Sequence, residues 1–170
     1  MPFTDLLRVT VLLTGAEATA LAAITAVAAN RDSDTTALLV AAVWWLIALA
    51  VGLYLGRPQR AADSLRDALA RARTATSLPP DTPARIALGR LWPIAATAIA
   101  AGALGIFFPG VAAIGAGYAL LVSLAWHSRE AAVLAIEQRD GVKFYVVPSS
   151  ALRPVQLVRS PGLRSERLRA

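Results

Sequence analysis

Residues 35–56 read TTALLVAAVWWLIALAVGLYLG and contain no charged side chain. A helix needs about 20 mostly apolar residues to cross roughly 30 Å of hydrocarbon, because each residue adds about 1.5 Å. A water-soluble helix of this length would carry a polar face, and this stretch has none. Residues 91–128 are likewise free of Asp, Glu, Lys and Arg, and they are long enough for two crossings. The sequence therefore predicts an all-α integral membrane protein.

A further apolar segment precedes these two. Residues 6–29 are interrupted only by the charged side chains of Arg8 and Glu17. The end of this segment, Ala-Val-Ala at 26–28, is typical of a signal-peptidase site. A glutamate in the middle of the apolar region is unusual in a signal peptide, so we predict a transmembrane helix that is retained.

The long uncharged run divides in its middle, where Pro109 and Gly110 favour a turn. With the first segment, this division predicts a four-helix bundle whose spans are 6–29, 36–55, 91–108 and 111–128. We assign residues 1–141 to this transmembrane domain and residues 142–170 to a basic cytoplasmic tail.

Local signals also predict structure outside the spans. Residues 59–77 place apolar side chains at helical spacing, which predicts an amphipathic cytoplasmic helix between the second and third spans. Thr82-Pro83 is typical of a helix start, so the third helix should begin before its span. The fourth helix should continue beyond the membrane and end at Asp140-Gly141. Residues 142–147 form a short run with β-strand propensity.

The distribution of basic residues predicts the orientation, because cytoplasmic loops are enriched in Lys and Arg. Residues 57–90 contain seven Arg and the segment after His127 contains eight basic residues, whereas the turn at 30–35 contains one. An even number of crossings then leaves both termini in the cytoplasm. Of the 17 basic residues 16 are Arg, and Ala is abundant. We interpret this as a bacterial composition, which makes the inner membrane the expected location.

Composition and motifs argue against several functional classes. The chain contains no Cys and a single His, which disfavours disulfides, iron–sulfur clusters and an all-protein zinc or haem site. It has neither a glycine-rich phosphate loop nor a nucleophile elbow. We therefore expect no catalytic residue, no metal site, no cofactor and no enzyme activity. The positive-inside rule already accounts for the basic charge, so we expect no nucleic-acid partner.

Glu17 is the residue that points most directly to function. Counted from Leu6, it lies about 16 Å along the helix, close to the bilayer midplane. A carboxylate there costs on the order of a few kcal/mol, so an ionisable residue at this depth is a functional candidate. The alternative is a protonated Glu17 that hydrogen-bonds a neighbouring helix and only holds the bundle together. By depth, its candidate partners are Trp44, Trp45, Thr97 and Tyr118.

A group of arginines follows the second span and forms the candidate contact with the membrane surface. Basic residues beside a transmembrane helix attract anionic lipids, by about 1 kcal/mol each near the surface. The residues predicted to contact anionic lipids of the bilayer are Arg60, Arg66, Arg71 and Arg73.

Two functions are compatible with this sequence. We favour a structural or accessory membrane protein that forms a homo-oligomer or docks to another membrane protein. Proton and ion pathways usually use several intramembrane charges, and Glu17 is the only one near the midplane. The alternative is a proton-coupled small-molecule transporter in which Glu17 exchanges a proton for a cationic substrate.

Overall fold

The protein is described from a computed structural model that places residues 1–60, 65, 69–70, 72–74, 82–149, 151 and 155–161. Along the chain, the helices and strands are α1 (Phe3–Arg31), α2 (Thr35–Leu55), β1 (Arg73–Thr74), α4 (Pro83–Phe107), α5 (Pro109–Trp126), α6 (Arg129–Asp140), β2 (Val142–Val146) and β3 (Leu157–Pro161). Within the described residues, four helical segments are long and apolar enough to cross a membrane, namely α1, α2, α4 and α5 with its continuation α6. The four predicted spans are thereby confirmed as helices.

The ends of the helices follow local sequence chemistry. The Asp34 carboxylate accepts a hydrogen bond of 2.9 Å from the Ala37 amide and caps the start of α2. Helix α4 begins at Pro83, as the sequence predicted, because proline lacks the amide that a first turn leaves unpaired. Gly141 ends α6 with a φ of 65°, a left-handed conformation that glycine adopts without strain.

The predicted continuation of the fourth helix is interrupted. A turn at residues 127–128 separates α5 from α6. Here the Ser128 hydroxyl donates a hydrogen bond to the carbonyl of Gly56, at the end of α2. A side chain at Gly56 would collide with the backbone carbonyl of Leu124, so this close approach requires glycine. A contact between residues 72 positions apart sets this turn, and periodicity alone does not predict it.

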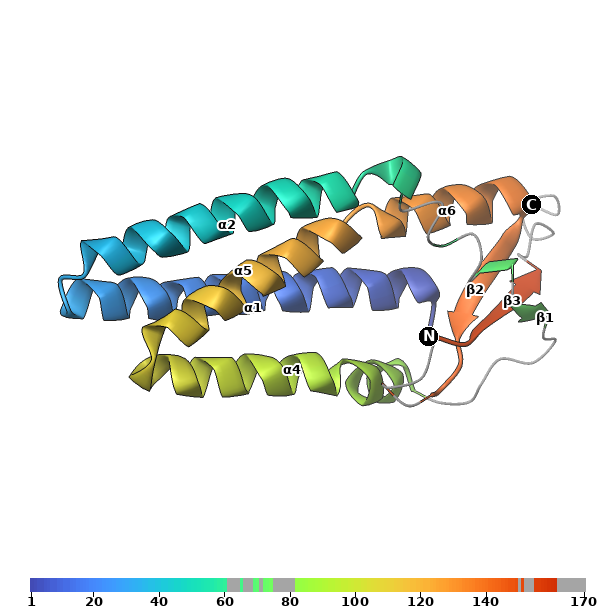
Figure 1. The fold of residues 1–170 in the computed structure, drawn as a ribbon. Coiled ribbons are helices and arrows are strands. Elements are labelled where there is room, and N and C mark those ends of the chain that lie inside the picture. The colour runs from blue at the N-terminus through green and yellow to red at the C-terminus, as the bar shows by residue number, and fades with distance from the viewer. Residues whose placement is uncertain are drawn as a thin grey trace, which may run out of the picture.

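Figure 1 shows α1 between α2 and α4, with α5 crossing α1 obliquely from the α4 side toward α2. The start of α1, the end of α2, the start of α4 and the end of α5 all lie at one end of the bundle (Figure 1). The three strands lie at the same end, which we call the cap end. The opposite end holds the turns that join α1 to α2 and α4 to α5 (Figure 1).

The strands at the cap end form a sheet in the order β1-β3-β2. Strands β2 and β3 are antiparallel, with Val142 opposite Pro161 and Val146 opposite Leu157, and β1 is parallel to β3. The start of the chain also joins this sheet, because the Val146 amide donates a 2.9 Å hydrogen bond to the Met1 carbonyl. Strand β2 confirms the β-strand propensity predicted for residues 142–147, whereas the pairing of β2 with β3 was not part of the predicted all-α fold with a basic tail.

Part of the predicted amphipathic helix at 59–77 lies outside the described residues. Within it, Arg73–Thr74 forms strand β1, so the helical prediction is wrong for these two residues. They pair with Val158 and Arg159 of β3, and this pairing with a distant segment overrides the local helical spacing.

The principal apolar core lies at the cap end and joins the helix ends, the segment after α2 and the sheet. Its buried members are Phe3, Leu6, Leu7, Leu65, Leu69, Ala72, Ile86, Leu91, Val133, Phe144, Val146 and Leu157. The core within the bundle is smaller and consists of Leu21, Ala112 and Ala116. Helix association in lipid lacks the hydrophobic driving force that acts in water, and it depends on close packing of small residues.

Candidate functional site

Glu17 lies on the side of α1 that faces α4. Its position follows from Ile24, which is two helical turns later on the same face and lies against Gly102 and Gly105 of α4. The Glu17 side chain is partly buried. Among the described residues, it makes no hydrogen bond or ion pair.

The other polar groups on the buried face of α1 are satisfied within the helix. The hydroxyls of Thr10, Thr14 and Thr25 donate to the carbonyls four residues earlier, at 2.8–2.9 Å. Glu17 differs from them because its carboxyl group has no such local acceptor or donor in the described chain. A hydrogen bond that would hold α1 to another helix through Glu17 is therefore not observed among these residues.

Trp44 and Trp45 join α2 to α5. The Trp45 indole donates to the Ala113 carbonyl at 2.9 Å, and the Trp44 indole donates to the Ile114 carbonyl at 3.3 Å. Trp44 also packs edge-on against Tyr118, with ring centroids 5.4 Å apart. Tyr118 remains 58% exposed on the outside of the bundle. These three aromatic residues thus belong to the α2–α5 interface.

Thr97 is exposed on α4, and its hydroxyl donates to the carbonyl of Ile94 at 2.8 Å. No hydrogen bond joins Glu17 to Thr97, to either tryptophan or to Tyr118 in the part of the chain that the structure describes. The structure thus does not bring the five candidates together in one site. The three aromatic residues form part of the α2–α5 interface, Thr97 is hydrogen-bonded within its own helix, and Glu17, among these described residues, forms no hydrogen bond with the other four.

The basic residues after α2 are described only in part. Arg60 donates a 2.7 Å hydrogen bond to the Tyr54 hydroxyl, and its guanidinium lies 4.2 Å from the centre of that ring. Arg57 lies over the same ring at 4.8 Å. Arg73 belongs to β1. The remaining two candidates for lipid contact, Arg66 and Arg71, lie outside the described residues.

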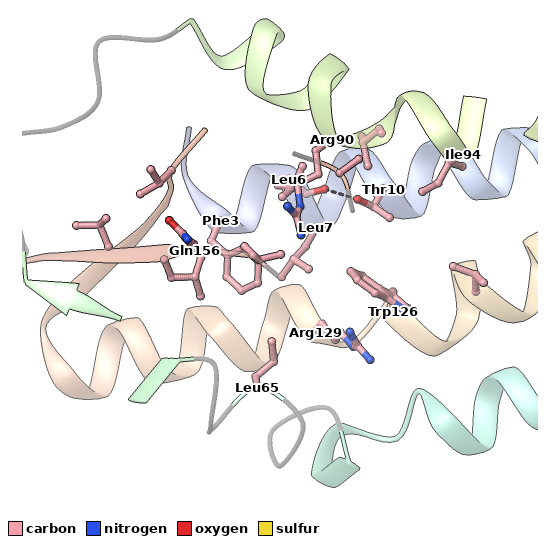
Figure 2. A pocket seen from close by; sticks show the side chains of 17 residues that line it. Phe3, Leu6, Leu7, Thr10, Leu65, Arg90, Ile94, Trp126, Arg129 and Gln156 are labelled. Atoms are coloured by element: carbon pink, nitrogen blue, oxygen red, sulfur yellow. Dashed lines mark hydrogen bonds between the residues drawn. The ribbon is translucent and has the colours of Figure 1, made fainter. Parts of the chain in front are cut away.

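The cap end also contains a cavity of about 810 Å³, which sequence analysis did not predict. Its lining residues come from the start of α1, the start of α4, the α5–α6 junction and the strand region. Figure 2 shows Arg90 on the α4 side of this cavity and Trp126 with Arg129 on the opposite side. The volume lies within the range of about 300–1,000 Å³ that is typical of small-molecule sites.

Two guanidinium groups line this cavity, while the described lining residues include no carboxylate. Arg90 donates to the Ser149 hydroxyl at 3.0 Å. Arg129 lies with its guanidinium carbon 4.1 Å from the centre of the Trp126 ring. Its Nε atom is buried and has no hydrogen-bond partner among the described residues. In the sequence, both residues only add to the basic count at the cytoplasmic side, so no local signal separates them from the other arginines.

Among the described residues, no group of His, Cys, Asp or Glu side chains is arranged to hold a metal ion. Taken together, the helices and their composition define a polytopic helical membrane protein with a small folded cap. No protein-family model, curated protein or solved structure matches this chain.

Proposed function

We propose that this protein is a structural or accessory component of the bacterial inner membrane, which acts by contact with other membrane components and not by catalysis. One observation supports this proposal most directly: the largest apolar core joins the cap to the ends of α1 and α4. The core includes buried residues from α1, α4, α6, β2 and β3, so the cap is packed onto the bundle and is not a loosely tethered tail. Such an arrangement suits a surface that is presented at a fixed position beside the bilayer.

The cap end is proposed to face the cytoplasm. All the segments rich in arginine connect to this end, and the opposite turns are poor in basic residues. Arg60, Arg66, Arg71 and Arg73 would then lie near the anionic inner leaflet, where each contributes to membrane contact. The proposed partners are anionic lipids together with a second copy of the chain or another membrane protein.

A proton-coupled transporter remains the second candidate function. It is favoured by the partly buried Glu17 carboxyl, which has no intramolecular partner among the described residues and is open to a proton or a cationic ligand. The chain, however, has no second carboxylate or histidine near the bilayer midplane that would complete a proton relay along the spans. The accessory function requires no such relay, and we therefore prefer it.

The accessory function can be tested by site-specific photocrosslinking in cells. A photoreactive amino acid at Leu134, an exposed position on α6, should give a discrete crosslinked product because the cap is the proposed contact surface. The same amino acid at Ser33, in the exposed turn at the opposite end, is the matched control and should give none. If neither position gives a crosslinked product, the proposal is contradicted. Equal amounts of crosslinked product from the two positions would contradict it as well.

A further inference from the structure

The cavity at the cap end combines apolar walls with positive charge. Phe3, Leu6 and Leu7 of α1 line it together with Leu91 and Ile94 of α4. Its two guanidinium groups lie across the cavity from one another in Figure 2, with Arg90 on α4 beside the apolar wall and Arg129 on the other side. A ligand that matches both parts carries a negative group and an apolar chain.

Arg129 carries the argument for an anion. A buried N–H group is costly to leave without a hydrogen bond. Its Nε atom is buried without a partner among the described residues. The adjacent acid, Glu130, forms an ion pair of 2.9 Å with Arg8 and is thus already engaged. The Trp126 ring covers one face of the guanidinium, which leaves its N–H edge as the part that can bind a ligand.

The place of the cavity in the fold favours a lipid over a free anion. It lies where α1 begins and where α5 ends, which is the level at which transmembrane helices meet lipid headgroups. A small inorganic anion would occupy only the space beside Arg129 and would leave the apolar wall of α1 and α4 in contact with water. An acyl chain along α1 and α4 would cover that wall and remove it from water.

We propose that the cap-end cavity binds the phosphate group of an anionic membrane lipid, with Arg129 as its principal ligand and the α1–α4 wall against its acyl chain. Arg90 lies across the cavity and provides a second positive charge. The guanidinium fork matches the oxygens of a phosphate, so the contact is directional as well as electrostatic. This inference requires membrane insertion, which the proposed function also requires, but it depends on neither the accessory role nor the orientation.

The test measures lipid binding to the full-length protein after purification and delipidation in a neutral detergent. Native mass spectrometry would follow titration with dioleoyl phosphatidylglycerol, and dioleoyl phosphatidylcholine would be the neutral reference. We expect a single saturable site for phosphatidylglycerol and roughly tenfold weaker binding of phosphatidylcholine. An excess of inorganic phosphate should not displace the anionic lipid, because phosphate lacks the chain that covers the apolar wall.

Substitution then locates the site. Arg129→Gln should weaken phosphatidylglycerol binding by roughly tenfold or more, since it removes a charge-assisted contact. Arg139→Gln is the matched control: Arg139 lies on the same helix, but it is exposed and pairs with Asp140 at 2.7 Å. This control should bind lipid like the unaltered protein. Unchanged binding in Arg129→Gln would overturn the proposal, and so would equal losses in both variants or displacement of the lipid by phosphate alone.

A second measurement keeps the test valid if Arg129→Gln does not fold. Phosphatidylglycerol with brominated acyl chains should quench tryptophan fluorescence when about one equivalent is bound, because Trp126 lines the cavity. The quenching should be largely lost in Trp126→Phe, which keeps an aromatic ring at this position. The assigned site would be overturned if the unaltered protein shows no quenching, or if the quenching persists in Trp126→Phe. Neither outcome would affect the crosslinking test of the accessory function.

Discussion

Among the described residues, the Glu17 carboxyl makes no hydrogen bond or ion pair, and the buried Nε atom of Arg129 makes no hydrogen bond. The two groups differ in how they can compensate for the missing interaction. A carboxyl group in an apolar environment becomes neutral by taking up a proton, and it then needs at most a weak hydrogen bond. A guanidinium cannot lose its charge in a protein. Arg129 therefore requires an anion or water, whereas Glu17 requires neither for the fold.

Substitution of Glu17 separates the two candidate functions. Since the described structure contains no hydrogen bond to this carboxyl, Glu17→Gln and Glu17→Ala should both keep the free energy of unfolding within about 0.5 kcal/mol of the unaltered protein. Thermal unfolding in detergent measures this. In proteoliposomes with a pH-sensitive dye inside, all three proteins should also show the same proton permeability.

The transport hypothesis gives a different result for the glutamine variant. Glutamine cannot release a proton, so addition of a cationic substrate should acidify the medium with the unaltered protein but not with Glu17→Gln. Such a difference, in a variant that is equally stable, would contradict the accessory function and establish the exchange of protons at Glu17.

Among the helices, the α2–α5 interface shows how an element is held without a large apolar core. Two indole N–H groups donate to the backbone carbonyls of Ala113 and Ile114 across this interface. A Cβ at Gly117 would overlap the Trp44 indole, so the ring can lie here only because residue 117 has no side chain. Small residues permit this kind of close approach between transmembrane helices.

Gly117→Ala should therefore destabilise the bundle by about 1–3 kcal/mol, because the added methyl group displaces Trp44 from α5. Thermal unfolding in detergent should show a lower transition temperature, with a change in tryptophan emission. Gly89→Ala in α4 is the control, since a Cβ there meets no atom within 4 Å. A stable Gly117→Ala protein with unchanged emission would contradict the proposed interface.

The same elements show what the sequence could and could not predict. The spans and the helix start at Pro83 follow from hydropathy and local chemistry, which are visible in one segment at a time. The sheet depends on pairing between β1, β3 and β2, and β1 is only two residues long. The run at 142–147 signalled β2 by its β-strand propensity, but the pairing of β1 with the distant β3 leaves no local pattern to detect. The cavity was missed for a similar reason, because Arg90 and Arg129 come together only in the folded chain.

For the whole molecule, the proposed orientation gives a direct prediction. A topology reporter fused after Ala170, or inserted near Ala75, should report the cytoplasm, and one inserted near Asp32 should report the outside. Seven arginines between 57 and 90 against one basic residue between 30 and 35 are the reason. A reporter near Ala75 that is active only outside the cytoplasm would reverse the arrangement.

The basic surface after α2 predicts a second property of the whole molecule. Purified protein should bind anionic liposomes better than neutral ones, and added salt should reduce the difference because it screens exposed charges. Replacement of Arg60, Arg66, Arg71 and Arg73 by Gln should weaken this preference, while the Arg139→Gln protein serves as the single-charge control. A preference that is unchanged in the fourfold variant would show that these arginines serve only topology or a protein partner.

The hydrogen bond between Met1 and Val146 joins the start of the chain to a strand that is synthesised much later, so it sets the order in which the parts of the protein can fold. At about 5–20 residues per second, a ribosome needs roughly 7–30 s to extend the chain from the first of these residues to the second. During that interval α1 has already emerged, but the strand that covers its start does not yet exist. The cap therefore closes last, after the helices have met the bilayer. A lipid at the α1–α4 wall can be enclosed as the final strands fold over it and does not have to enter a finished cavity.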